Sequence, residues 1–153
     1  MKKVLMNMAN AREKDQLKRM KQLQKDKKCF FCKENYLDVG ASPVLHESTS
    51  WYIKKNDYPY TGSIHHYLIV PKKHIRKISD IHPASWPELL LLISWLEKKL
   101  KVKGYSMFVR AGDMQYTGGT IDHLHFHFLV GGKKPGTSKL TDNILITLGH
   151  KKK

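Results

Sequence analysis

Long hydrophobic runs, cysteine and acidic residues are all scarce in this sequence of 153 residues. The longest apolar run, Leu89 to Trp95 with one serine inside it, is far shorter than the roughly 20 residues that a membrane-spanning helix requires. The basic N-terminus soon becomes rich in charged residues, so it lacks the apolar stretch of a secretory signal peptide. We therefore expect a cytoplasmic protein with no membrane partner.

The shortage of acidic residues gives the chain a strongly positive charge. Only 13 residues are Asp or Glu, against 28 Lys and Arg, so the formal net charge is +15. A charge of this size attracts anions and raises their rate of association. Nucleotides and nucleic acids are the obvious partners. A basic surface also serves solubility or follows from the general composition of an organism's proteins, so charge alone does not decide between these explanations.

The composition otherwise suits one folded domain. Hydrophobic residues make up 41% of the chain and aromatic residues 10%, which excludes global disorder. The length predicts a single domain. Residues 1–28 lack glycine and proline and carry apolar residues such as Met20 and Leu23 at roughly helical spacing. We expect residues 1–28 to form a basic, helical N-terminal extension and residues 29–153 to form the folded domain.

The pattern of apolar residues predicts strands around one long helix. Segments rich in β-branched and aromatic residues indicate five strands, at 50–54, 66–70, 105–110, 123–130 and 143–148. Leucine and isoleucine recur at helical spacing from Leu89, which predicts a helix over about residues 85–103. Ser85 and Glu88 have the spacing of a capping box. The result is an α+β fold in which helices cover one face of a mainly antiparallel sheet.

The most informative segment is residues 123–130, with the sequence HLHFHFLV, in which histidine alternates with apolar residues. Alternate side chains of a strand share a face, so three imidazoles would line one side while the apolar residues pack into a core. Metal binding by all three is the competing interpretation. At about 3.3 Å per residue, His123 and His127 lie about 13 Å apart at Cα, too far for all three histidines to share one ion. At least one histidine therefore has another role.

This segment is similar to the signature of the histidine triad (HIT) family of nucleotide hydrolases and transferases. A second segment, residues 64–74 with the sequence IHHYLIVPKKH, resembles the family's strand that ends in proline, two basic residues and histidine. The resemblance covers residues from about 29 to 131. It implies a HIT-like fold for residues 29–153, favours an adenosine-containing nucleotide as the substrate, and suggests a two-fold homodimer.

The resemblance also implies catalytic roles. His125, the middle histidine of the triad, would attack the α-phosphorus of a nucleoside phosphate and form a covalent nucleotidyl-histidine, which water or inorganic phosphate would resolve. His127 would donate to the phosphate oxygens or to the leaving group. His66 would help to hold His125 in its reactive tautomer, whereas His65 should point to the opposite face. Dinucleoside polyphosphates and nucleoside phosphoramidates are the implied substrates.

Shorter stretches imply the substrate contacts. Thr120 matches a Ser/Thr position that contacts phosphate in the family, and Gly119 would let backbone N–H groups approach the phosphate. Many members carry glutamine at the position of Gly119, so one phosphate donor is missing or comes from elsewhere, and Gln115 is the candidate substitute. Asn56 resembles the asparagine that holds ribose hydroxyls in the diadenosine tetraphosphate phosphorylase-like branch. The stretch around Asn56 also favours a simple turn.

Cys29 and Cys32 form a CxxC pair and are the only cysteines in the chain. In a cytoplasmic protein such a pair more often binds metal or does redox work than forms a disulfide. A closed zinc site requires four ligands, of which the pair provides two. In zinc-containing branches of the family the other two correspond to His74 and His123, so the resemblance implies one structural zinc ion. A buried pair without metal is the alternative.

Two other functions remain open from the sequence. The net charge of +15 favours the removal of adenylyl groups from nucleic-acid ends, as in the aprataxin-like branch of the family. Glycine in place of glutamine at position 119 favours a nucleotide-binding regulatory protein with little turnover.

Overall fold

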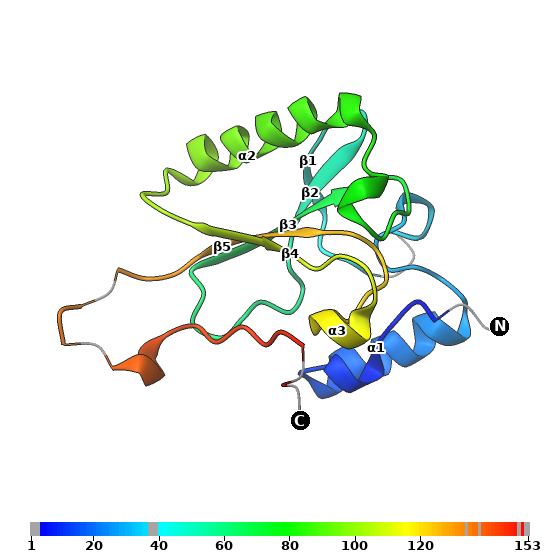
Figure 1. The fold of residues 1–153 in the computed structure, drawn as a ribbon, viewed down its shortest axis with the longest axis horizontal. Helices are drawn as coiled ribbons and strands as arrows, with labels where there is room; N and C mark the ends of the chain where they lie inside the picture. The colour runs from blue at the N-terminus through cyan, green and yellow to red at the C-terminus, as the bar shows by residue number, and fades with distance from the viewer. Residues whose placement is uncertain (1–3, 37–39, 134, 138, 150, 152–153) are drawn as a thin grey trace.

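A computed structural model describes residues 4–36, 40–133, 135–137, 139–149 and 151. Its centre is a five-stranded sheet in the order β1-β2-β3-β5-β4, with every neighbouring pair antiparallel (Figure 1). The strands are β1 (Val44–Glu47), β2 (Trp51–Lys55), β3 (His65–Pro71), β4 (Ser106–Val109) and β5 (Phe126–Val130). The helices are α1 (Lys14–Lys25), α2 (Trp86–Leu100) and the short α3 (Met114–Thr117). The predicted α+β fold with a five-stranded antiparallel sheet and one long helix is confirmed.

Helices cover both faces of the sheet (Figure 1). α2 packs on one face, where Leu92 and Leu96 share a core with Ile69 of β3. α1 lies on the other face, where Met20 shares a second core with Leu68 of the same strand. The expectation that helices cover a single face is therefore wrong. Successive residues of β2 and β3 are buried rather than alternate ones, so both faces of these strands require cover.

One predicted strand does not form and another was missed. Residues 143–148 are not in a strand, and in Figure 1 this segment passes below the sheet towards the end of α1. The fifth strand is instead β1, at the edge of the sheet and mostly exposed. A short, exposed edge strand has one unpaired side and no buried face, so its sequence carries no alternating apolar pattern.

The start of α2 is fixed by a tertiary contact. Ser85 makes no side-chain capping hydrogen bond, so the predicted capping box is wrong. Glu88 instead accepts hydrogen bonds from the backbone N–H and the hydroxyl of Ser50, at 2.8 and 2.7 Å. This contact ties the first turn of α2 to the turn that precedes β2.

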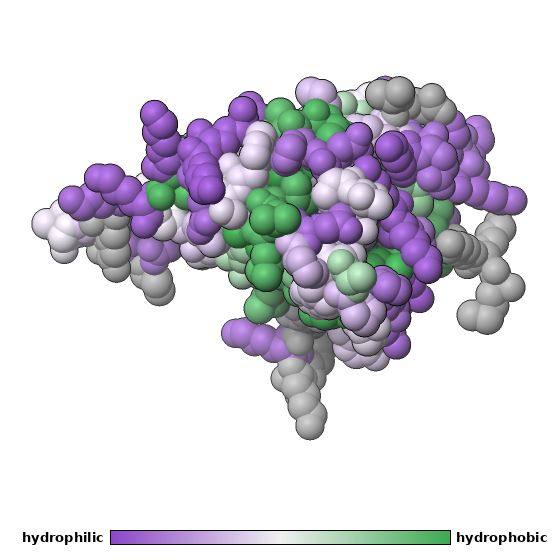
Figure 2. All heavy atoms as spheres, turned by 90° about the horizontal axis from the view of Figure 1, so that it is seen from above, coloured by the Kyte–Doolittle hydropathy of each residue, from purple (hydrophilic) through white to green (hydrophobic). Residues whose placement is uncertain are grey.

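The outer face of α2 carries exposed leucines. Leu90 is 65% exposed and Leu91 is 70% exposed. Figure 2 shows hydrophobic side chains gathered across the middle of the face that α2 covers, with hydrophilic ones around them. The two-fold homodimer remains a prediction. Among the described residues, no helix has both the length and the apolar character needed to span a membrane.

The N-terminal segment is helical in part and contacts the rest of the chain. Residues 1–3 of the predicted extension lie outside the described residues. Met6 pairs with Ile121 through an isolated β-bridge, and Leu5 and Met6 belong to the same core as Leu68. The boundary between the extension and the HIT-like domain at residues 28 and 29 stays a prediction.

Candidate active site and metal centre

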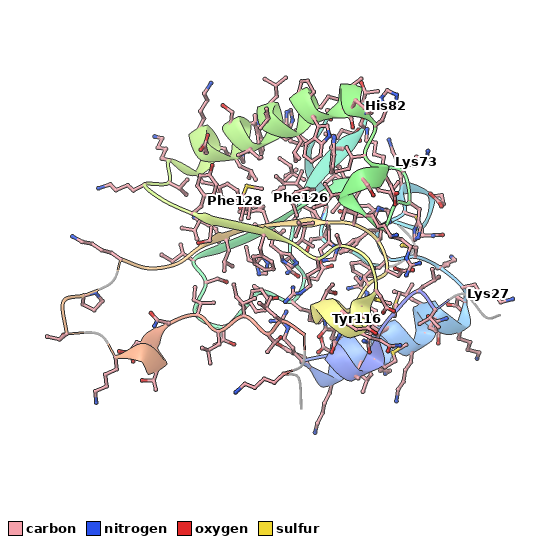
Figure 3. The ribbon with its side chains drawn as sticks, in the orientation of Figure 1. Lys27, Lys73, His82, Tyr116, Phe126 and Phe128 are labelled. Atoms are coloured by element: carbon pink, nitrogen blue, oxygen red, sulfur yellow. The ribbon has the colours of Figure 1, made fainter. Side chains whose placement is uncertain are left out.

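The side chains of β5 alternate between the two faces of the sheet. Phe126 and Phe128 lie on the side of α2 and belong to its core (Figure 3). His127 lies on the opposite face, as the alternation of side chains along a strand requires. His125, immediately before β5, lies beside it, with the two ring centroids 4.9 Å apart. Two imidazoles are thus placed side by side on the face that α1 covers.

His125 is buried and has a defined tautomer. Its Nδ1 lies 2.7 Å from the backbone carbonyl oxygen of His123. A carbonyl only accepts, so Nδ1 carries the hydrogen and Nε2 keeps a free lone pair. Burial lowers the pKa of His125 from 6.5 to about 4. At neutral pH the ring is therefore uncharged, with Nε2 available as a nucleophile.

His127 and His66 form a buried hydrogen-bonded pair. The backbone N–H of Tyr60 donates to Nδ1 of His66 at 3.2 Å, and burial lowers the pKa of His66 to about 3. The neutral ring therefore carries its hydrogen on Nε2, which donates to Nδ1 of His127 at 2.8 Å. Burial also holds the pKa of His127 well below its ordinary value. His127 is consequently left with an N–H group at Nε2.

These contacts differ from the expected ones in one respect. We expected His66 to hold His125 in its reactive tautomer, but His66 hydrogen-bonds to His127 instead. The backbone carbonyl of His123 sets the tautomer of His125. Aromatic rings fix the orientation of the pair: Phe108 stacks on His127 with centroids 4.2 Å apart, and Tyr60 stacks on His66 at 4.9 Å. The imidazoles are therefore held before any ligand binds.

A cleft with a volume of about 60 Å³ lies beside His125 and His127. Its wall includes residues of α1 and the segment before it, of the loop after β2, and of the loop that precedes the histidines. Asn56, Gly119 and Thr120 all line the cleft. The structure thus brings most of the predicted substrate-binding residues to one place.

Gln115, by contrast, is exposed and lies outside the residues that line this cleft. The backbone N–H of Gly119 donates to the hydroxyl of Thr117 at 3.2 Å. Asn56 accepts from the backbone N–H of Tyr58 at 3.0 Å, and its Nδ2 lies 3.1 Å from Nε2 of His66. Asn56 therefore lies against His66 as well as lining the cleft.

A second cluster lies beside the histidine pair and consists of Cys29, Cys32, His74 and His123. Their ligand atoms all lie within 4.8 Å of one another. Sγ of Cys29 is 3.4 Å from Nδ1 of His123, and Sγ of Cys32 is 3.3 Å from Nδ1 of His74. Bonds of about 2.0 to 2.3 Å to a tetrahedral zinc ion give ligand separations of about 3.3 to 3.8 Å. These two distances therefore fit a zinc ion held by two sulfur and two nitrogen atoms.

The surroundings of His123 support this fit. Its Nε2 lies 2.8 Å from the carbonyl oxygen of Pro71, so Nε2 carries the hydrogen and Nδ1 has a lone pair directed at the cysteines. Metal-binding histidines commonly donate their second ring nitrogen to a carbonyl in this way. Nε2 of His74 is buried without a hydrogen-bond partner among the described residues. The four residues can hold a metal ion, and zinc matches the donor set best.

The sequence pattern of the HIT domain matches residues 45–134, which is more than half of the chain. The chain belongs to the HIT domain family. An uncharacterized HIT-like protein of Helicobacter pylori is 34% identical over 70 residues, which is 44% of this chain and 65% of that protein. The chain thus spans slightly less than two thirds of this relative's length.

Two further relatives match about 70% of this chain. The adenosine 5′-monophosphoramidase of Saccharomyces cerevisiae is 25% identical over 104 residues, 68% of this chain and 63% of that protein. The solved structure of a HIT family hydrolase from Clostridium thermocellum is 27% identical, with a TM-score of 0.53, and covers 73% of this chain and 96% of its own. This HIT protein therefore shares the fold of nearly the whole Clostridium thermocellum structure.

Sequence reasoning missed Arg110 and Tyr60 in this HIT site. Arg110 follows β4, in which Phe108 pairs with His127 of β5. Residues two apart share a face, so Arg110 lies on the same side as Phe108 and the histidines. Its Nη1 is 3.3 Å from Nε2 of His127 and donates to the hydroxyl of Tyr60 at 2.8 Å. The alternation through residues 106–110 was a usable signal, but only once the pairing of β4 with β5 is known.

Proposed function

We propose that this HIT protein is a nucleotide hydrolase or nucleotidyltransferase that acts at the α-phosphate of an adenosine-containing nucleotide. Dinucleoside polyphosphates and nucleoside phosphoramidates are the proposed substrates. The observation that supports this best is the neutral His125, with Nδ1 bound to a carbonyl and Nε2 free beside the cleft. The similarity to an adenosine 5′-monophosphoramidase supports adenosine as the base.

The first step transfers the nucleotidyl group to the protein. The Nε2 lone pair of His125 attacks the α-phosphorus, and the bond from phosphorus to the leaving oxygen or nitrogen breaks with its electron pair. A phosphate leaving group departs as an anion, whereas an amine takes up one proton from solvent. The N–H at Nε2 of His127 donates a hydrogen bond to the phosphoryl oxygens, where negative charge concentrates.

The second step releases the nucleotide. Water attacks the phosphorus, the bond to Nε2 breaks, and its electron pair returns to His125. One proton of the water goes to solvent and the remaining hydroxyl stays on the nucleoside monophosphate. Inorganic phosphate attacking in place of water would give a nucleoside diphosphate. His66 positions His127 through the 2.8 Å hydrogen bond between their rings, so it acts without touching the substrate.

Zinc held by Cys29, Cys32, His74 and His123 would have a structural role. The four residues join the N-terminal CxxC segment to the end of β3 and to the residue whose carbonyl binds His125. A closed set of four protein ligands leaves no position for substrate. The zinc site would therefore stabilise the backbone that orients the proposed nucleophile.

The experiment is detection of the covalent intermediate. The chain is incubated with adenylylated substrates and quenched in mild base, because phosphoramidates of histidine are acid-labile, and the peptide that contains His125 is weighed by mass spectrometry. We expect one added AMP mass, which disappears in His125→Ala. His65→Ala, a neighbour of His66 in β3, is the matched control and should keep the adduct.

The outcomes separate this proposal from its alternatives. No adduct and no release of AMP or ADP from any substrate would refute the proposal and favour a binding protein with little turnover. The net charge of +15 supports a second candidate, in which the adenylyl group is carried by a nucleic-acid end. Turnover of adenylylated DNA or RNA alone among the substrates would establish that candidate.

A further inference from the structure

The side chain of Arg110 occupies space that Gly119 leaves open. A Cβ atom on Gly119 would lie 3.5 Å from Cδ of Arg110 and 3.2 Å from the hydroxyl oxygen of Thr117. The approach to Thr117 is tighter than ordinary van der Waals contact, whereas the approach to Arg110 is an ordinary one. Gly119 therefore packs directly against the side chain of Arg110.

Neutral oxygen atoms hold this guanidinium in place. Nε donates to the carbonyl of Thr117 at 2.9 Å, Nη1 to the hydroxyl of Tyr60 at 2.8 Å, and Nη2 to the carbonyl of Thr147 at 2.6 Å. Among the described residues, no carboxylate forms an ion pair with Arg110. Its position is thus fixed while its positive charge stays uncompensated.

Arg110 and His127 present hydrogen-bond donors to each other. The hydrogen bond from His66 leaves a hydrogen on Nε2 of His127, and every guanidinium nitrogen carries hydrogen. These two N–H groups nevertheless face each other with their nitrogens 3.3 Å apart. An anionic oxygen that accepts from both groups would relieve this arrangement and form two charge-assisted hydrogen bonds. The geometry is that of an anion site.

A second guanidinium approaches from the N-terminal segment. Cζ of Arg12 lies 4.3 Å from the centre of the Tyr60 ring, and Cζ of Arg110 lies 6.0 Å from the same centre. Arg12 donates to the carbonyl of Tyr58 and lines the same cleft. It too has no ion pair with a carboxylate among the described residues. Two uncompensated positive charges around one ring repel each other, and a bound anion would reduce that repulsion.

The contacts of Arg110 relate the anion site to the reaction centre. Nη1 of Arg110 is 3.3 Å from Nε2 of His127, whose ring centroid is 4.9 Å from that of His125. Among the described residues, the polar contacts of Arg110 are with His127, Tyr60, Thr117 and Thr147, and none is with the nucleophile His125. The leaving group departs opposite His125, because the attacking and leaving atoms lie roughly in line in phosphoryl transfer, so a guanidinium group held by His127 rather than by His125 can meet it.

We propose that Arg110 and Arg12 form a subsite for the negatively charged group that leaves when His125 attacks. The site then favours nucleotides whose leaving group is a phosphate over nucleotides that release a neutral amine. The inference rests on the proposed function and adds a specificity-determining pair to it.

The test compares two substrates that give the same AMP adduct. One is diadenosine triphosphate, which releases the ADP anion through a phosphate oxygen, and the other is an adenosine 5′-alkylphosphoramidate, which releases a neutral amine. Arg110→Gln should lower kcat/KM for diadenosine triphosphate by about 100-fold, the effect of losing one well-placed transition-state donor. It should lower kcat/KM for the phosphoramidate by less than about 10-fold. Arg110→Lys should restore part of the lost kcat/KM for diadenosine triphosphate, because lysine keeps the positive charge without the planar fork.

Two further variants control for folding and for the overall charge. Arg12 is exposed but contacts Tyr58 and Tyr60, so Arg12→Gln should still unfold cooperatively while shifting the ratio of the two kcat/KM values in the same direction. Lys98→Gln removes one positive charge from the exposed end of α2, far from the cleft wall, and should leave the ratio unchanged. Equal losses on both substrates in Arg110→Gln and Arg12→Gln would overturn the inference.

His125→Ala separates this inference from the proposed function. Loss of turnover in His125→Ala, together with an unchanged substrate ratio in the arginine variants, would leave the function standing and refute the subsite. Should the wild-type chain turn over neither substrate, the proposed function fails and calorimetry decides the subsite. Wild-type protein should then bind ADP at least about 10-fold more tightly than AMP, and Arg110→Gln should remove this difference. Equal affinities for ADP and AMP in the wild type would refute the subsite.

Discussion

The buried pair of His66 and His127 makes the stability of the fold depend on pH. Burial lowers the pKa of His66 from 6.5 to about 3. In the unfolded chain this ring takes up a proton near pH 6.5, whereas in the folded chain it stays neutral until about pH 3. Between these values the unfolded state binds more protons, so stability falls as the pH falls. Above pH 6.5 the contribution of His66 to stability is constant.

The size of this effect follows from the two pKa values. At pH 5 the unfolded ring is 1.5 pH units below its ordinary pKa of 6.5, and the folded ring is still neutral. Each unit corresponds to about 1.4 kcal/mol, so the free energy of unfolding falls by about 2 kcal/mol between pH 7.5 and pH 5. For a chain of this length that loss lowers the melting temperature by about 4 to 8 °C.

The assay isolates His66 from other titrating groups. Wild-type protein and His66→Gln are unfolded by heat or denaturant at pH 7.5 and at pH 5, and the drop in stability is compared. The wild type should lose about 2 kcal/mol more than His66→Gln, because glutamine has no proton to gain. The exposed His82→Gln is the matched control and should behave as the wild type does. Equal drops in wild type and His66→Gln would refute the reasoning.

Two further predictions concern the metal centre and a close approach of the backbone. Cys29→Ser removes one of the four ligands, so the affinity for zinc should fall more than about 100-fold in a chelator competition, while wild-type protein binds one ion. Wild-type protein that takes up no zinc would contradict this. Gly118 has φ of +70°, and a Cβ there would lie 2.8 Å from the carbonyl oxygen of Leu148. Gly118→Ala should therefore cost at least about 1 kcal/mol in denaturant unfolding, whereas Gly132→Ala, which meets no atom within 4 Å, should not. Similar losses in both glycine variants would rule out this explanation.

Local patterns in the sequence predicted a large part of this fold. Apolar residues at helical spacing from Leu89 predicted α2, and the alternation in residues 123–130 predicted β5 with its phenylalanines and His127 on opposite faces. These predictions succeeded because the burial of one face leaves a period in the sequence. The edge strand β1 and the segment 143–148 were misassigned, since exposure removes that period in the first case and β-branched residues imitate it in the second.

The candidate site was likewise predictable from the sequence only in part. Short motifs with fixed spacing in the sequence indicated the family, the CxxC pair and the paired histidines. The resemblance to the family, and not any spacing, implied that His74 and His123 join the two cysteines in a zinc site. Only the tertiary structure decided that His66 binds His127, that the carbonyl of His123 sets the tautomer of His125, and that Arg110 and Arg12 meet around Tyr60. Most of these contacts join residues far apart in the chain, and all of them depend on strand register and on the path of backbone and loops, which no local pattern encodes.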